Sequence, residues 1–161
     1  MSFNPLIRCN IINGGIAVDL PKEITDLTYK VIGVCMEVHR ELGPGFPEEY
    51  YQRALEFEFP ERKIAAEPQK AFVMPYKNIH VGMNYLDFVI EEKLILEIKS
   101  VNRLNEIHMF QVLKYLAVSN LPVALLVNFG NAKLEQRRIL PTAKWQEYRN
   151  NEQLTKQRIE G

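Results

Sequence analysis

Residues 94–101, LILEIKSV, form the segment on which the interpretation of this chain depends. Their apolar composition predicts a buried strand. Glu97 and Lys99 lie two positions apart within it, so a strand points both side chains to the same face. Charged side chains are rarely buried without a partner or a chemical role. The pattern therefore places an acid and a base on one face of a core strand.

The residues before this segment predict a β-hairpin, with strands at about 83–90 and 93–99. Cross-strand partners share a face of the sheet, and a slip of one residue exchanges the two faces. A three-residue loop at 91–93 makes one face wholly apolar by pairing Ile90 with Leu94, Phe88 with Leu96 and Leu86 with Ile98. The other face then carries Asp87 opposite Glu97 and Tyr85 opposite Lys99.

Two facing carboxylates repel each other unless a cation lies between them. Mg²⁺ suits this position, because it takes oxygen ligands and keeps waters for a substrate phosphate. Lys99 could hold the scissile phosphate or orient the attacking water, while the metal activates that water. This is the minimum for metal-assisted phosphodiester hydrolysis. The alternative is a structural salt bridge from Lys99 to Glu97 or Asp87 at the end of the sheet.

The rest of the chain predicts a mixed α/β protein with a central sheet, in the order ααβββαββ. The apolar spacing from Glu23 to Leu42 is that of an amphipathic helix, which "GPG" at 43–45 ends. We expect a second helix at 47–59, ended by Pro60, and a third at about 105–118. Further strands are expected at 70–76, near an edge because Pro75 interrupts it, at 122–130 and at 133–140.

The composition is that of an ordinary globular protein, with 47% hydrophobic and 25% charged residues. The 161 residues suit one domain, which we place at 22–140 between an N-terminal arm at 1–21 and a polar tail at 141–161. The formal net charge is zero, so no global basic field points to nucleic acid. No apolar run reaches the ~18 residues of a membrane helix, and no signal peptide opens the chain. We expect a cytoplasmic protein, and homo-oligomerisation stays open.

The order of these motifs resembles the PD-(D/E)XK nuclease superfamily. Asp87 is followed about ten residues later by Glu97-Ile98-Lys99, and then by a helix with Gln111 and Tyr115. The stretch at 37–55 contains Gly45, Glu48 and Tyr51, the signature of the GxxExxY family within that superfamily. The segments "YLDFVIEEKLILEIKSV", "QVLKYL" and "LLVNFG" are similar to later blocks of that family. The resemblance covers roughly residues 24–140.

The resemblance implies a restriction-endonuclease-like core, in which helices flank a central mixed β-sheet. It implies a Mg²⁺- or Mn²⁺-dependent nuclease acting on DNA or RNA, with Asp87 and Glu97 as metal ligands and Lys99 as the catalytic lysine. Glu48 would add an acid, and Gln111 would lie beside the site. Read from the residues alone, Glu48 is also a favourable acid in the first turn of a helix, and Gln111 with Tyr115 could serve packing against the sheet. A catalytically inactive module that binds nucleic acid or a protein partner is the competing reading.

Overall fold

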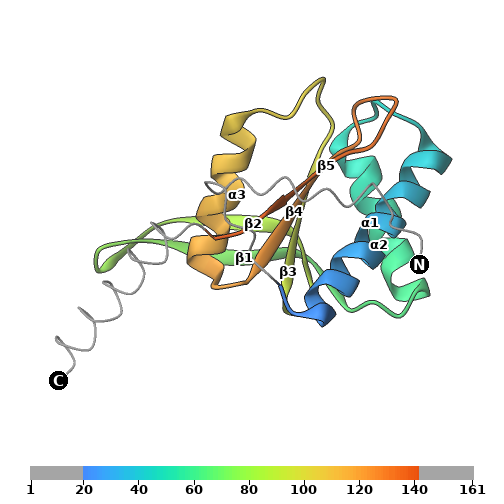
Figure 1. The fold of residues 1–161 in the computed structure, drawn as a ribbon. Helices are drawn as coiled ribbons and strands as arrows, with labels where there is room; N and C mark the ends of the chain where they lie inside the picture. Colours follow the sequence, from blue (N-terminus) through green and yellow to red (C-terminus); the bar gives the residue numbers. More distant parts are fainter. Residues whose placement is uncertain (1–19, 142–161) are drawn as a thin grey trace.

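A computed structural model describes residues 20–141, and these form a central sheet between two layers of helices (Figure 1). The predicted order of elements is confirmed: α1 (Lys22–Leu42), α2 (Glu48–Glu61), β1 (Ala66–Tyr76), β2 (Ile79–Ile90), β3 (Leu94–Lys99), α3 (Glu106–Ser119), β4 (Val123–Asn128) and β5 (Glu135–Ile139). The arm at 1–19 and the tail after Pro141 lie outside the described residues.

The five strands follow the order β1-β2-β3-β4-β5. Only β3 and β4 are parallel to each other, because α3 carries the chain back between them; the other neighbours are antiparallel. The sheet is therefore mixed, as predicted. β1 and β5 are its edges, which confirms the edge position expected from Pro75.

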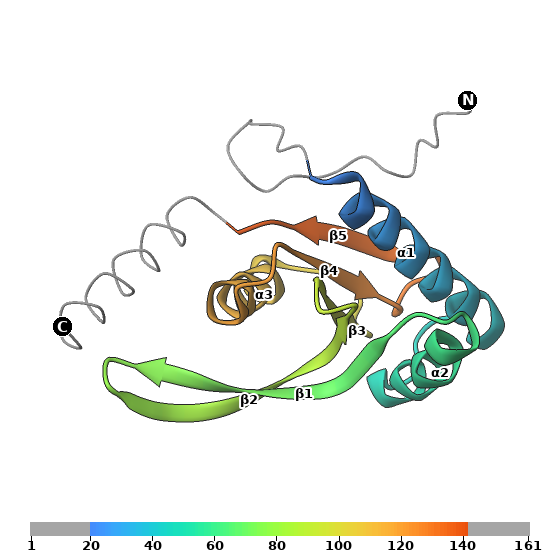
Figure 2. The same ribbon diagram turned by 90° about the horizontal axis from the view of Figure 1, so that it is seen from below.

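The sheet has a core on each of its faces (Figure 2). On one face α1 and α2 pack their buried side chains, including Val31 and Leu55, against Phe88 and Leu96. On the other face α3 packs Val112 and Leu116 against Ile95 and Leu126. Both faces of β3 and β4 are consequently covered, which explains why these strands read as continuous apolar runs.

Two predicted boundaries were wrong. Pro60 does not end α2, which continues to Glu61 with the proline inside its last turn. The end of the helix holds together because the amide of Arg62 donates to the Glu58 carbonyl (3.1 Å), so the missing proline N–H removes one bond only. In addition, β1 and β2 begin earlier than the predicted residues 70 and 83, although they end at Tyr76 and Ile90 as predicted. β1 begins at Ala66 because it pairs with β2 as far as Ile90, and β2 begins at Ile79 because the hairpin continues to its turn.

Within residues 20–141, no helix is long and apolar enough to cross a membrane.

Candidate active site

The hairpin of β2 and β3 brings Asp87 and Glu97 together. Its ladder pairs Phe88 with Leu96 and Ile90 with Leu94, which confirms the predicted register and the three-residue loop. At the next pair, Asp87 and Glu97, side-chain oxygens accept the main-chain amides in place of main-chain carbonyls. The Asp87 amide donates to Glu97 Oε1 at 3.2 Å, and the Ile98 amide donates to Asp87 Oδ2 at 2.8 Å. The two carboxyl groups therefore lie between the strands, where carbonyl groups would normally accept these bonds.

This insertion corrects one part of the expected hairpin. Leu86 does not pair with Ile98, because the ladder ends at Phe88 and Leu96. Leu86 packs instead with the cluster under α3, whereas Ile98 packs with the cluster under α1 and α2. The carboxyl groups of Asp87 and Glu97 thus separate the strands at the point where β2 leaves the core.

The environment of the two acids disfavours their charged forms. Glu97 is 5% exposed, and burial, reinforced by the charge of Asp87, raises its pKa to about 9. Burial likewise raises the pKa of Asp87, although the Ile98 amide and the nearby Lys99 charge oppose this. Without a cation the pair therefore retains a proton near neutral pH.

Lys99 ends β3 at the same place. Its side chain is half-buried, and its charge acts on both acids. Within residues 20–141, however, no ion pair joins Lys99 to Asp87 or Glu97. The structural salt bridge considered from the sequence is thus not formed, and the ammonium group remains available to another anion.

Gln111 approaches the acids through Tyr115 rather than directly. Gln111 Nε2 donates to the Tyr115 hydroxyl at 2.7 Å. Tyr115 is buried, and its pKa is raised by burial and then by the charge of Glu97. Phe72 of β1 packs edge-on to the Tyr115 ring at 5.4 Å between centroids. Tyr115 therefore packs on the sheet, while Gln111 has no hydrogen bond to either acid among the described residues.

Glu48 is the first residue of α2, and its side chain is exposed. The structure gives it no contact with the acid pair within the described residues. The loop before it is nevertheless fixed to the Lys99 end of β3, because the Ser100 hydroxyl donates to the Phe46 carbonyl. Tyr51 clamps the same loop by donating to the Gly43 carbonyl at 2.6 Å and stacking on Phe129 at 4.4 Å.

Sequence reasoning missed Gln52, which contacts the site from α2. Its Nε2 donates to the Asp87 carbonyl at 3.2 Å, and its Oε1 is buried with no hydrogen-bond partner in the described part of the chain. A signal existed, because Gln52 lies one helical turn after Glu48 and shares its side of α2. Gln69 was also missed; it donates to Asp87 Oδ1 at 3.5 Å from a backbone with φ of 50°.

Asn128 is a third residue that was missed. Its side chain is fully buried. The side-chain oxygen accepts from the Val101 amide at 3.0 Å and the side-chain nitrogen donates to the Val101 carbonyl at 2.9 Å, so the two bonds resemble those between paired strands. It also accepts from the Gly130 amide and donates to Glu135 Oε2. The signal was an amide that ends an otherwise apolar strand. Asn128 fixes the chain that leaves Lys99.

The donor set fits a hard divalent cation. The two carboxyl groups supply oxygen atoms, the ligand type that Mg²⁺ and Mn²⁺ prefer. No group of three or more His, Cys, Asp or Glu residues that could hold a metal occurs between residues 20 and 141. Mg²⁺ usually keeps several waters and takes only one or two carboxylates from the protein.

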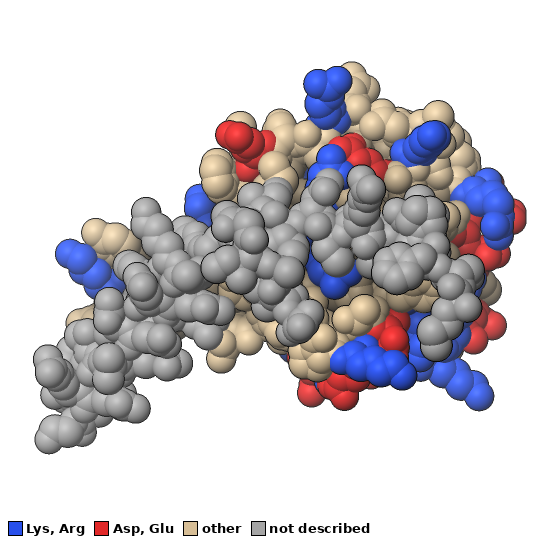
Figure 3. All heavy atoms as spheres, in the orientation of Figure 1, with Lys and Arg blue, Asp and Glu red and all other residues tan. Residues whose placement is uncertain are grey.

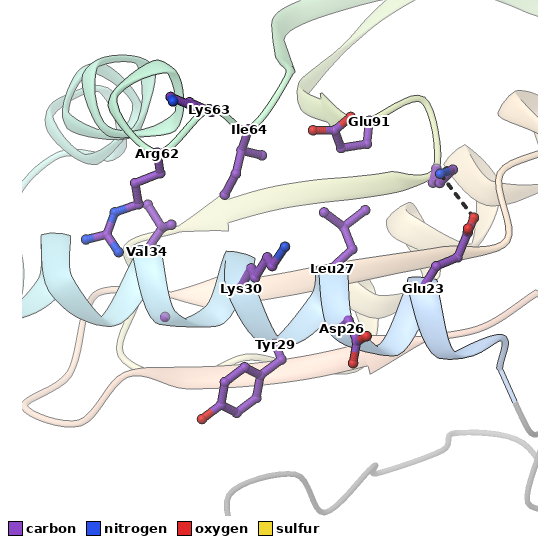
Figure 4. A pocket seen from close by; sticks show the side chains of 12 residues that line it. Glu23, Asp26, Leu27, Tyr29, Lys30, Val34, Arg62, Lys63, Ile64 and Glu91 are labelled. Atoms are coloured by element: carbon purple, nitrogen blue, oxygen red, sulfur yellow. Dashed lines mark ion pairs between the residues drawn. The ribbon is translucent and has the colours of Figure 1, made fainter.

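A surface groove of about 700 Å³ lies elsewhere, between α1, the end of α2 and the β2–β3 turn (Figure 4). Both charge signs line it, and Lys93 there forms an ion pair with Glu23 at 3.0 Å. It contains neither Asp87 nor Glu97. We therefore place the candidate site at the acid pair, where two carboxyl groups are held together in a buried position.

Comparison with known proteins identifies the family of the chain. The family model described as "PD-(D/E)XK nuclease superfamily" matches residues 25–139. The chain belongs to the PD-(D/E)XK nuclease superfamily. The matched range contains all five candidate site residues. Nuclease-like chemistry, interaction with nucleic acid and use of a divalent metal are typical of this superfamily.

A solved structure gives independent support for the fold. The structure described as "Crystal structure of SSO0001" superposes with a TM-score of 0.51 at 14% sequence identity. The match covers 78% of this chain and 61% of that chain. No curated protein sequence matches the chain. At this identity the likeness shows the fold, which is the restriction-endonuclease-like sheet with flanking helices expected for the superfamily.

Proposed function

We propose that the protein is a Mg²⁺-dependent nuclease, with Mn²⁺ as a substitute, that hydrolyses a phosphodiester bond of DNA or RNA. One observation carries the proposal: Asp87 and Glu97 are held against each other in a buried position while no ion pair neutralises them. Such an arrangement costs stability in the free protein and is typical of functional sites.

In this proposal Asp87 and Glu97 are the metal ligands. When bound, the ion supplies a water of lowered pKa and positive charge beside the phosphate. Lys99 donates to a non-bridging phosphate oxygen and stabilises the negative charge that develops as water attacks phosphorus and the P–O ester bond breaks. The leaving oxygen takes up a proton. Gln111 with Tyr115 and Glu48 act in support, by orienting water and by adding an acid at the rim.

We also propose that the chain belongs to the GxxExxY branch of the superfamily. Gly45, Glu48 and Tyr51 support this. The structure explains why glycine and tyrosine occur at positions 45 and 51. The Gly45 amide donates to the Phe129 carbonyl at 3.2 Å with φ of 83°, a conformation that suits glycine. Tyr51 clamps the loop. Glu48 suits the first turn of α2 as an acid, and its role in the chemistry rests on the match to the signature.

The test uses two site variants with matched controls. Lys99→Ala and Glu97→Gln should each abolish Mg²⁺-dependent cleavage of a DNA or RNA substrate while the far-ultraviolet circular dichroism stays unchanged. The exposed Lys22→Ala and Glu41→Gln on α1 make the same chemical changes and should retain activity. Cleavage that survives both site substitutions would mean a different site or a contaminant.

The competing function is a catalytically inactive module that binds nucleic acid or a protein partner. The zero formal net charge favours it, because a nucleic-acid enzyme of this size often carries a basic excess. If the wild type cleaves no nucleic acid with any divalent metal but binds it in a salt-dependent way, the binding module replaces the nuclease.

A further inference from the structure

The hairpin of β1 and β2 extends well past the core, and Figure 2 shows it running below α3 as a two-stranded ribbon. We call residues 69–86 the ribbon. One of its faces is covered, because Phe72 packs on Tyr115 of α3. Its other face is open, and here Val73 lies opposite Met83. The exposed apolar side chains of the ribbon, which are 37–59% accessible, are Val73, Tyr76, Ile79, Val81, Met83 and Tyr85.

The charges of the ribbon are all positive. Between Pro68 and Leu86 the sequence contains Lys70 and Lys77 but no Asp or Glu, in a chain whose formal net charge is zero. Lys70 forms an ion pair at 2.8 Å with Glu67, which precedes the ribbon, so the unpaired charge of the ribbon is that of Lys77. Lys77, in the turn at the far end, lies over the Tyr76 ring at 5.5 Å and has no acidic partner among the described residues. Figure 3 shows basic atoms at this end of the described surface.

This distribution favours a polyanion over a second copy of the chain. Two ribbons packed face to face would bring only like charges together, which costs energy. Pairing along the open edge of β1 is also disfavoured, because Pro68 and Pro75 lack the amides that a neighbouring strand needs. A nucleic acid, in contrast, complements Lys77 and can accept apolar and aromatic side chains against its bases.

The dimensions of the ribbon favour B-form DNA over A-form RNA as the ligand. A two-stranded ribbon fits the major groove of B-form DNA, which is about 12 Å wide, whereas the major groove of A-form RNA is too narrow for side chains to read. Asp87 follows the ribbon directly on β2. From Ile79 to Asp87 the strand spans about 26 Å at ~3.3 Å per residue. The far end of the ribbon and the acid pair would therefore lie within about one turn of the same duplex, since a turn is about 34 Å.

We propose that the ribbon is a DNA-recognition element that enters the major groove and presents an adjacent backbone phosphate to the acid pair. Lys77 contacts a phosphate, while Ile79 and Met83 contact base edges such as the thymine methyl group. The inference rests on the proposed function, since it assigns duplex DNA to the same site.

Binding and cleavage are measured separately to test it. Binding of a fluorescent DNA duplex is followed by anisotropy in EDTA, where no cleavage occurs, together with the mass of the protein by light scattering. The ribbon variant is Ile79→Ser with Met83→Ser. Phe57→Ser, which removes an apolar side chain that is 65% exposed on α2, is the control. Lys77→Ala is paired with Lys30→Ala on α1, and an RNA duplex of the same sequence serves as a second ligand.

The wild type should bind DNA more tightly than RNA, and the ribbon variant should lose about tenfold or more in DNA affinity while Phe57→Ser does not. Lys77→Ala should lower the slope of log affinity against log salt by about 0.9, and Lys30→Ala should leave it unchanged. Equal DNA binding by the ribbon variant overturns the inference, as does a wild type that binds no duplex or prefers RNA.

A wild-type dimer that the ribbon variant dissociates also overturns the inference, because the open face then belongs to a second copy. The proposed nuclease activity can be rejected independently of the ribbon inference. A wild type that binds DNA through the ribbon but never cleaves it with a divalent metal keeps the ribbon inference and rejects the nuclease. Conversely, cleavage that is unaffected in the ribbon variant keeps the nuclease and rejects the ribbon.

Discussion

At the scale of single residues, the site is defined by two carboxyl groups that accept main-chain amides from each other's strand. Asp87 and Glu97 each receive one N–H from the opposite strand, so their positions are fixed by the backbone and not by a flexible partner. A site built in this way needs no metal to hold its geometry. It does need something to offset the charge, and in the free protein a retained proton does so.

The retained proton gives the first stability prediction. Glu97 has a pKa of about 9 in the folded protein, above its ordinary value of 4.5. Both states are protonated below about pH 4.5, and above this the unfolded chain releases the proton first. The wild type in EDTA should therefore lose stability as pH rises from about 4.5 to about 9, by up to about 1.4 kcal/mol per pH unit for one proton.

The side chain at position 97 of Glu97→Gln cannot ionise, so this variant should lack the decline. The difference in free energy of unfolding between Glu97→Gln and the wild type should therefore increase with pH. Denaturant unfolding in EDTA at several pH values measures the difference. The exposed Glu41→Gln should follow the wild type at every pH. If the free energies of unfolding of Glu97→Gln and the wild type stay parallel between pH 5 and 9, Glu97 is not buried as a proton-retaining acid.

At the scale of elements, the turn after β4 joins parts of the site that are distant in sequence. The Phe129 amide donates to the Lys99 carbonyl, and the Phe129 carbonyl accepts from Gly45 before α2. Asn128 and Gly130 meet Val101, two residues after Lys99. One short segment thus connects the end of β3 at Lys99 with the loop that leads to Glu48.

Gly130 is the tightest point of this turn. A Cβ there would lie 2.1 Å from the Val101 carbonyl oxygen and 2.6 Å from its nitrogen, which are backbone atoms that cannot rotate away. We expect Gly130→Ala to cost about 1–3 kcal/mol in the free energy of unfolding. Gly33→Ala is the matched control, because nothing lies within 4 Å of its Cβ and it is interior to α1. It should be stabilising, by up to about 1 kcal/mol.

Denaturant titration of the two glycine variants gives both values. Equal stability of Gly130→Ala and the wild type would show that the turn can move away from Val101. The activity of Gly130→Ala below its unfolding transition is informative as well, since displacement of Val101 should carry Lys99 with it and reduce cleavage.

At the scale of the whole molecule, sequence reasoning succeeded where a periodic pattern is fixed by burial. The apolar alternation of β2 and β3 determined their register, because one face had to be buried and only one loop length allowed it. The spacing of α1 was predicted for the same reason. Asp87, Glu97 and Lys99 could therefore be placed together from local pattern alone.

The same reasoning failed where a residue's role depends on contacts across the fold. Gln52 and Asn128 are ordinary polar residues in sequence. Their roles come from hydrogen bonds to main-chain groups that are distant in sequence, those of Asp87 and Val101. The ribbon was missed for another reason. Pro75 and Gly82 interrupt the strand pattern, and the exposed apolar residues of an extended hairpin resemble those of a core strand.

Stability of the whole fold separates a metal site from a structural ion pair. In EDTA near neutral pH, Asp87→Asn should leave the melting temperature unchanged or raise it, with a gain of at most about 1 kcal/mol, because it removes the charge that disfavours ionisation of the buried Glu97. Added Mg²⁺ or Mn²⁺ should stabilise the wild type by mass action and Asp87→Asn far less. Differential scanning calorimetry with and without metal measures both effects.

A structural ion pair between Asp87 and Lys99 predicts the opposite change in melting temperature. If Asp87 mainly neutralised Lys99, its removal would leave an unpaired, partly buried ammonium, and breaking such a pair typically costs ~3–5 kcal/mol. A clear fall in the melting temperature of Asp87→Asn in EDTA, with no response of the wild type to metal, would exclude the proposed site.

The interruption of the β2–β3 ladder also gives the site its own spectroscopic signal. The amide protons of Asp87 and Ile98 point at carboxylate oxygens, unlike those of Val89 and Ile95, which lie inside the regular ladder. The electron density on those oxygens changes when they lose a proton or ligate an ion, and the amide chemical shift follows. In ¹H–¹⁵N spectra, the resonances of Asp87 and Ile98 should therefore move with pH and with added Mg²⁺, while those of Val89 and Ile95 stay comparatively still. Occupancy of the site could then be followed in the protein alone, before any substrate is known.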